Sequence, residues 1–177
     1  MEIYLVRHTS VDVPSGICYG HTDVGLKDSF VEEAAQTKSQ LEGLEFDAVY
    51  TSPLSRAIRL ATFCGYPNAE IDRRLIEFNF GEWELQSYDR LYAEVSEFRD
   101  WCENYLTQRC PGGDSFPDQI SRVRSFMDDM RTIGYMKVCA FCHGGVLAIA
   151  RALSGQLTME ETFHDIPPYG SVIRVVY

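Results

Sequence analysis

The sequence has no long apolar run and is short of basic side chains. No apolar segment approaches the roughly 18 residues that a membrane-spanning helix needs, and the N-terminal residues lack the basic and then apolar order of a signal peptide. Lysine and arginine number 16 against 26 aspartates and glutamates, which gives a formal net charge of −10. Such a balance argues against a nucleic acid or an anionic membrane as partner. We therefore expect a cytoplasmic protein in which any anion site is a local basic pocket.

Cysteines are also sparse, and metal-binding patterns are missing. The six cysteines lie mostly within apolar runs and do not suggest a disulfide framework. Cys139 and Cys142 form a CxxC pattern, but two strand residues three apart point to opposite faces and cannot share a metal. There is no HExxH, no carboxylate cluster beside His8 or His143, and no lysine that would make residues 111–114 a nucleotide-binding loop. The sequence therefore predicts neither a metal nor another cofactor.

What the sequence does contain is two apolar strands that each end in a histidine. Residues 3–6 and 137–142 are short and β-prone, as expected of buried strands in an α/β sheet. Arg7 and His8 follow the first run, and His143 follows the second. Ligands bind at the carboxyl edge of such sheets. Either histidine alone could merely terminate its strand, but two at equivalent positions indicate a site.

The rest of the pattern predicts a single α/β domain over residues 1–177. The length and the 45% of apolar residues suffice for a sheet covered by helices on both faces. The region of about 86–133 is predicted to be a helical insertion between strands, with one helix over 86–107 and a second that Ser115 caps. The other predicted elements are helices over 29–44, 53–64, 146–153 and 158–164 and strands over 46–51, 69–72 and 171–177.

Two further residues indicate chemistry at the same edge. Ser52 is predicted to cap the helix that follows it, and Arg56 then lies in the first turn, where a cation opposes the helix dipole. An arginine is better explained there if an anion lies against the helix end. Glu77 stands among apolar and aromatic neighbours, which would suit it to proton transfer, although an exposed loop glutamate fits the composition equally well.

Together these residues form a set suited to phosphoryl transfer. The guanidiniums of Arg7 and Arg56 offer planar forked donors for phosphate oxygens. A neutral histidine is an effective nucleophile near pH 7, and His8 and His143 supply two imidazoles. Glu77 is the carboxyl suited to protonate a leaving oxygen. Phosphoryl transfer needs chiefly this combination of positioning and neutralised charge.

Four groups of residues also occur in a fixed order along the chain. They are Leu5-Val-Arg-His8, Thr51-Ser-Pro-Leu-Ser-Arg-Ala57, Leu75-Ile-Glu77 with Phe80-Gly-Glu-Trp-Glu84, and Cys142-His-Gly-Gly145. They resemble the ordered motifs of the histidine phosphatase superfamily, the phosphoglycerate-mutase-like phosphatases. The resemblance implies a mostly parallel sheet of about six strands between two helical layers, without a metal. It also implies that His8 becomes phosphorylated, that Arg7, Arg56 and His143 hold the phosphate, and that Glu77 donates and accepts the proton.

Within that superfamily, residues 16–20, 22–23 and 111–115 look most like the alpha-ribazole phosphatases of cobalamin assembly. That narrower likeness makes a phosphomonoesterase acting on alpha-ribazole 5'-phosphate the leading hypothesis. A phosphoglycerate-mutase-type phosphotransferase and a broad small-molecule phosphatase are the alternatives. A non-catalytic phosphate-binding module is disfavoured, because both His8 and Glu77 are present. The expected partner is thus a small phosphorylated metabolite, and the sequence does not fix the oligomeric state.

The expected phosphate donors differ from the superfamily pattern. That pattern continues from the histidine as Gly-x-Thr and places an Asn a few residues on, whereas Thr9, Val11 and Pro14 occupy those places here. We therefore expect Thr9, Ser15 or backbone N–H groups near Gly20 to donate instead. The aromatic residues expected to stack on a heteroaromatic leaving group, or else to pack in the wall, are Tyr19, Phe80 and Trp83.

Overall fold

The computed structural model describes residues 1–177 and contains one mixed, mostly parallel sheet. Its strands are β1 (Glu2–Arg7), β2 (Ala48–Thr51), β3 (Glu70–Ile71), β4 (Lys137–Cys142) and β5 (Val172–Val176), in the spatial order β3-β2-β4-β1-β5. Only β5 runs antiparallel to its neighbour. The α/β class is confirmed and every strand predicted from the residue pattern is present. The resemblance implied about six strands, and the sheet has five.

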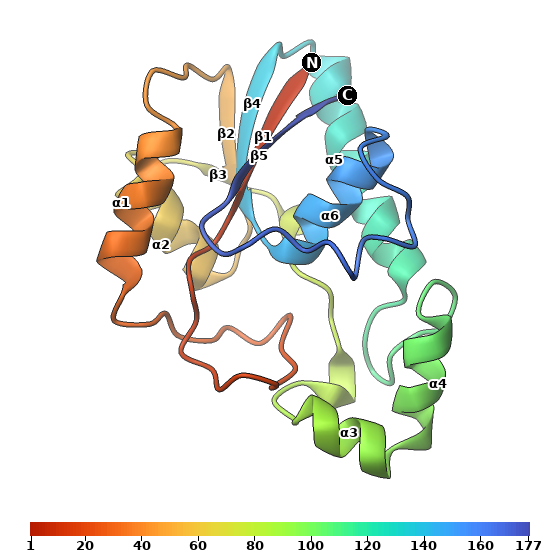
Figure 1. Cartoon of the computed structure of the whole chain (residues 1–177). Coiled ribbons are helices and arrows are strands. Elements are labelled where there is room, and N and C mark those ends of the chain that lie inside the picture. Colours follow the sequence, from red (N-terminus) through yellow and green to blue (C-terminus); the bar gives the residue numbers. More distant parts are fainter.

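Helices cover both faces of the sheet, so the three-layer arrangement is confirmed (Figure 1). On one face α1 (Phe30–Gln40) and α2 (Ser55–Phe63) pack through residues such as Ala34 and Leu60. On the other face lie α5 (Phe116–Ile133) and α6 (Gly144–Leu153). Cys139 and Cys142 belong to these two opposite apolar clusters, as the strand periodicity predicted. None of the helices combines the length and apolar character that crossing a bilayer requires.

Two short helices, α3 (Tyr88–Glu94) and α4 (Ser96–Asn104), lie beyond the carboxyl edge of the sheet (Figure 1). The single helix predicted over 86–107 is therefore wrong. The break falls at Val95, a β-branched residue whose extended backbone (φ −112°, ψ 107°) ends α3 and begins α4. These helices enclose a third apolar cluster, made of Cys18, Phe78, Phe80, Trp83, Leu91, Phe98, Trp101 and Cys110.

Several predicted boundaries shift by a few residues. The capping box of Ser115 with Asp118 at the start of α5 is confirmed, and Gly134 ends that helix in the left-handed region. In contrast, α1 stops at Gln40, since residues 41–43 form a turn. Strand β2 begins at Ala48 rather than at residue 46, and α6 begins at Gly144 rather than at residue 146. The segment 158–164 contains turns instead of the expected helix.

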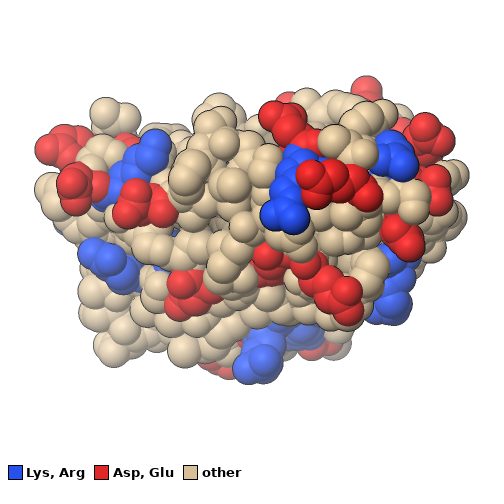
Figure 2. Space-filling view, turned by 90° about the horizontal axis from the view of Figure 1, so that it is seen from below, with Lys and Arg blue, Asp and Glu red and all other residues tan.

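Charged side chains are mixed over the surface that faces the carboxyl edge. In Figure 2, which views the molecule from that side, basic and acidic residues lie interspersed among other residues, without a broad basic area. Arg56, by contrast, is fully buried, and Arg7 is half-buried. The cations expected to bind an anion are therefore held inside an acidic molecule rather than displayed on it.

Candidate active site

The two histidines lie side by side at the carboxyl edge, as predicted. β1 and β4 are adjacent and parallel, and their register pairs Arg7 with Cys142. The next residue on each strand is a histidine, so the rings of His8 and His143 meet with centroids 5.2 Å apart. Both side chains are buried. The pairing of β1 with β4 therefore brings together two histidines that are far apart in the sequence.

His8 presents one free ring nitrogen. Its Nδ1 lies 2.8 Å from the carbonyl oxygen of Thr9, and because a carbonyl only accepts, Nδ1 carries the proton. The lone pair therefore resides on Nε2. Burial, together with the charges of Arg56 and Arg7, lowers the pKa of His8 to about 3. The imidazole is consequently neutral near pH 7, the state that a nucleophile requires.

His143 is oriented by the hydroxyl of Ser52, a residue that was predicted to cap the following helix. Its Nε2 lies 2.7 Å from Oγ of Ser52, and burial together with the nearby Arg56 lowers its pKa. Ser52 does not cap α2 as predicted: Leu54 is extended (φ −77°, ψ 137°), so the helix begins only at Ser55. The Ser52 hydroxyl instead lies in the interior, where it orients an imidazole.

Arg7 and Arg56 approach His8 and are each held by backbone carbonyls. Arg56 donates to the carbonyls of Gly20 (2.6 Å) and Thr22 (2.9 Å), and Arg7 donates to that of Pro167 (2.5 Å). We call Arg7, His8, Arg56 and His143 the rim cluster. Four buried polar atoms in and beside it have no partner: Nε of Arg7, Nε of Arg56, Nδ1 of His143 and Oγ1 of Thr9. Buried polar groups are normally satisfied, so this concentration of unpaired groups indicates the place of an oxyanion.

Glu77 is neither exposed nor surrounded only by apolar groups. Its carboxylate accepts hydrogen bonds from the backbone N–H of Phe78 (2.9 Å), from Nε2 of Gln119 (3.0 Å) and from the N–H of Gly145 (3.1 Å). A side chain at position 145 would place its Cβ 2.5 Å from Glu77 Oε1 and would therefore displace the carboxylate. Glu77 does lie in a loop, but its side chain is half-buried rather than exposed, and three hydrogen bonds fix the carboxylate in one orientation.

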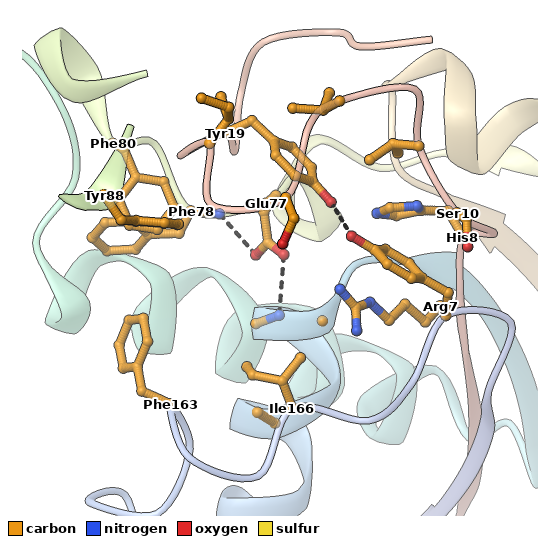
Figure 3. Close-up of a pocket in the computed structure, with 18 of the residues that line it drawn as sticks. Arg7, His8, Ser10, Tyr19, Glu77, Phe78, Phe80, Tyr88, Phe163 and Ile166 are labelled. Atoms are coloured by element: carbon orange, nitrogen blue, oxygen red, sulfur yellow. Dashed lines mark hydrogen bonds between the residues drawn. The ribbon is translucent and has the colours of Figure 1, made fainter. Parts of the chain in front are cut away.

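A cavity of about 540 Å³ opens beside His8 and Glu77 (Figure 3). Its charged lining residues are Arg7, Lys27 and Glu77. The part of the lining that we call the aromatic wall consists of Phe78, Phe80, Tyr88, Phe116 and Phe163. The site therefore joins a polar, cationic end to a large apolar chamber.

The residues predicted to contact substrate divide into three groups. Ser15 and Tyr19 line the cavity. Thr9 is buried next to His8. Gly20 contributes its carbonyl oxygen, which accepts a hydrogen bond from Arg56. Trp83 does not line the cavity, which favours packing, the other role expected of it, over a contact with substrate. It belongs to a short 3-10 turn (Gly81–Trp83) that directs the indole into the third apolar cluster, against Phe98 and Trp101.

Three residues at the site were missed by the sequence analysis. Gln119 is a buried polar residue on the apolar face of α5, and that break in the pattern is a signal that could have found it. Ser52 had been assigned only to capping. Tyr169 lies over Arg7, with the guanidinium carbon 4.0 Å from its ring centroid, and its hydroxyl meets that of Tyr19 at 2.6 Å. These two tyrosines are 150 positions apart, so no local pattern connects them.

No group of three or more His, Cys, Asp or Glu side chains is placed to hold a metal ion. The set available for chemistry is therefore two imidazoles, two guanidiniums and one carboxylate around an unsatisfied oxyanion position.

This constellation matches a known family. A profile of the histidine phosphatase superfamily (branch 1) matches residues 3–177. The chain therefore belongs to the histidine phosphatase superfamily, as its motifs indicated, and it is a phosphatase-family enzyme whose substrates are phosphorylated small molecules.

Individual relatives carry different substrate names. "Putative phosphoserine phosphatase 2" of Hydrogenobacter thermophilus is 31% identical over 160 residues, which cover 87% of this chain and 79% of that protein. The adenosylcobalamin/alpha-ribazole phosphatase of Escherichia coli K12 is 28% identical over 171 residues, covering 93% and 84%. Among solved structures, a phosphoglycerate mutase from Thermus thermophilus has a TM-score of 0.79 at 26% identity and covers 99% of this chain and 92% of its own.

Proposed function

We propose that the protein is a metal-independent phosphomonoesterase that works through a phosphohistidine on His8. Nε2 of His8 attacks phosphorus, the bond from phosphorus to the leaving oxygen breaks, and Glu77 gives that oxygen a proton. Glu77 then takes a proton from water, which attacks the phosphohistidine. The phosphorus–nitrogen bond breaks and inorganic phosphate leaves. Arg7 and Arg56 balance the charge on the phosphoryl oxygens throughout, and the neutral His143 adds a hydrogen bond to the phosphoryl group.

The observation that carries this proposal is the set of unpaired buried groups around a neutral His8. Nε of Arg7 and Nε of Arg56 need an acceptor, Nδ1 of His143 also has no partner, and Nε2 of His8 is a free nucleophile. Because both arginines are already fixed by carbonyls, little reorganisation is needed when charge develops on the phosphoryl group.

We further propose alpha-ribazole 5'-phosphate as the substrate. Its leaving group carries a flat dimethylbenzimidazole base, and the aromatic wall supplies apolar ring faces and edges on which such a base can pack. The cavity volume also accommodates a nucleoside-sized group. The relative from E. coli that is named for this activity covers most of the chain.

Phosphoserine is the second candidate, because the relative with 31% identity carries that name. A phosphoserine site would have to hold an ammonium and a carboxylate beyond the phosphate. Lys27 is the one basic residue lining the cavity besides Arg7, and it is exposed. This sparse charged lining favours the aromatic leaving group over the amino acid.

The deciding experiment compares phosphate release from alpha-ribazole 5'-phosphate, phosphoserine and 3-phosphoglycerate by purified protein. We expect the highest kcat/KM for the first, and a higher value for phosphoserine would replace it. Isomerisation of 3-phosphoglycerate without phosphate release would favour a mutase, and binding without turnover of any ester would favour a binding module. Activity should withstand EDTA and be inhibited by vanadate, a five-coordinate mimic of the transition state. Loss in EDTA with recovery on adding zinc or magnesium would contradict the metal-independent mechanism.

A further inference from the structure

Glu84, in the Gly-Glu-Trp-Glu segment, uses both carboxylate oxygens to hold a distant piece of backbone. It accepts from the N–H groups of His21 (2.7 Å) and Thr22 (2.6 Å), from the N–H of Phe80 (3.2 Å) and from the hydroxyl of Thr22. Three of these four donors belong to residues 21–22, about 60 positions away. Glu84 therefore fixes that backbone against the turn at 80–84.

The backbone held in this way carries the acceptors of Arg56. The two carbonyls that bind its guanidinium belong to Gly20 and Thr22. Arg56 is fully buried, so water cannot replace these acceptors if they move. The position of residues 20–22 therefore sets the orientation of the guanidinium. It also sets where the remaining donors of Arg56 point, including the unpaired Nε.

Residues 20–22 are also restrained by contacts on both sides, in addition to the hydrogen bonds to Glu84. A Cβ at Gly20 would lie 1.7 Å from the carbonyl oxygen of Phe78, so the two segments are in direct contact. On the other side, Asp23 accepts from the backbone N–H and the hydroxyl of Ser55 at the start of α2. Burial lowers the pKa of Arg56, and the charge of Glu84 is among those that oppose this shift.

We propose that Glu84 is a positioning residue that aims the Arg56 guanidinium at the phosphoryl group by fixing residues 20–22. The inference rests on the proposed function, because it assigns Arg56 to phosphoryl binding. Glu84 itself does not line the cavity. In a Glu84→Gln variant the amide NH2 would face N–H donors, so the backbone must shift and Arg56 with it.

The first test compares Glu84→Gln with Glu82→Gln, two glutamates in the same turn. Glu82 is exposed, and its carboxylate makes no hydrogen bond. Orthovanadate binding is measured by calorimetry in both variants. We expect Glu84→Gln to weaken binding about 10- to 100-fold, as for the loss of a hydrogen bond to a charged group. Glu82→Gln should change it less than about twofold. Equal effects in the two variants would overturn the inference.

The second test separates positioning from general loosening of the fold. If Glu84 acts through Arg56, then Glu84→Gln should weaken vanadate binding far less in an Arg56→Ala background than in the wild type. Arg56→Lys replaces Arg56→Ala if thermal melts show the alanine variant unfolded. Losses that simply multiply would mean that Glu84 does not act through Arg56. A wild-type protein that neither binds vanadate nor releases phosphate would instead overturn the proposed function.

Discussion

The rim cluster and the aromatic wall are built in opposite ways. Members of the rim cluster end β1, directly follow β1 or β4, or start α2, and carbonyls and a hydroxyl fix their nitrogen atoms. The aromatic wall comes mostly from loops and turns that meet only in three dimensions, with Tyr88 on the short helix α3, Phe163 in a turn segment and Phe116 at the start of α5. The residues proposed to carry the chemistry are thus attached to the sheet, whereas the surface proposed to select the leaving group is attached mostly to loops.

The largest expected effect on turnover comes from removing the nucleophile of the rim cluster. His8→Ala should abolish turnover while the fold persists, because the imidazole ends a strand and contributes little apolar packing. Rapid quench of the wild type with labelled substrate should trap an acid-labile, base-stable phosphoprotein that the variant lacks. The exposed His164, replaced by alanine, serves as the control and should retain activity. Label on a serine or an aspartate would contradict the assignment of His8.

Glu77 lies where the two regions meet, and its effect should depend on the leaving group. Glu77→Gln should lower kcat by about 10²- to 10⁴-fold, the usual range for a positioned acid or base. An alkyl oxygen needs a proton to leave, whereas p-nitrophenolate does not. A pre-steady-state measurement should therefore show a rapid burst of p-nitrophenol and slow release of an alkyl alcohol. Equal slowing of both bursts would mean that Glu77 only shapes the cavity.

The buried His8, a member of the rim cluster, also makes stability depend on pH. The pKa of His8 is about 3 in the folded protein and about 6.5 when unfolded. Below about pH 6.5 the unfolded chain therefore binds a proton that the folded protein does not, and stability falls as pH falls. Between pH 7.5 and 5.5 the wild type should lose about 1.4 kcal/mol more than His8→Asn, measured by urea unfolding. His164→Asn is the matched control, and a parallel loss in His8→Asn would contradict this interpretation.

The smallest expected effect concerns the aromatic wall. Phe163→Leu keeps an apolar side chain but removes a ring, so kcat/KM for alpha-ribazole 5'-phosphate should fall about 3- to 10-fold. The value for a small alkyl ester such as glycerol phosphate should hardly change. Phe98→Leu, in the third apolar cluster but off the cavity, controls for loss of packing. Equal losses for both esters in Phe163→Leu would show that the wall does not select the leaving group.

The same contrast explains what could be predicted from sequence. His8 and His143 were found because each directly follows an apolar run, and adjacent parallel strands must bring such positions together. Arg56 was found because its charge opposes a helix dipole. The five strands followed from short β-prone segments, whereas the sixth came only from the family resemblance and does not form.

The errors arose where tertiary contacts decide the outcome. Trp83 looked available for a ligand, but its direction depends on packing against α4, which no local pattern encodes. Ser52 has the residue type of a helix cap, and the buried His143 uses it instead. Gln119 lies in a helix that was interpreted only as core, although its one buried amide contacts Glu77.

The position of β1 inside the sheet, between β4 and β5, has a consequence for synthesis on the ribosome. β1 pairs with β4 on one side and with β5 on the other. Both partner strands lie far along the chain, so they are synthesised long after β1. At about 5–20 residues per second, the roughly 130 residues between β1 and β4 take on the order of ten seconds to emerge. During that interval an apolar strand has no partner, and the nascent chain depends on chaperones or on transient collapse to keep it from aggregating.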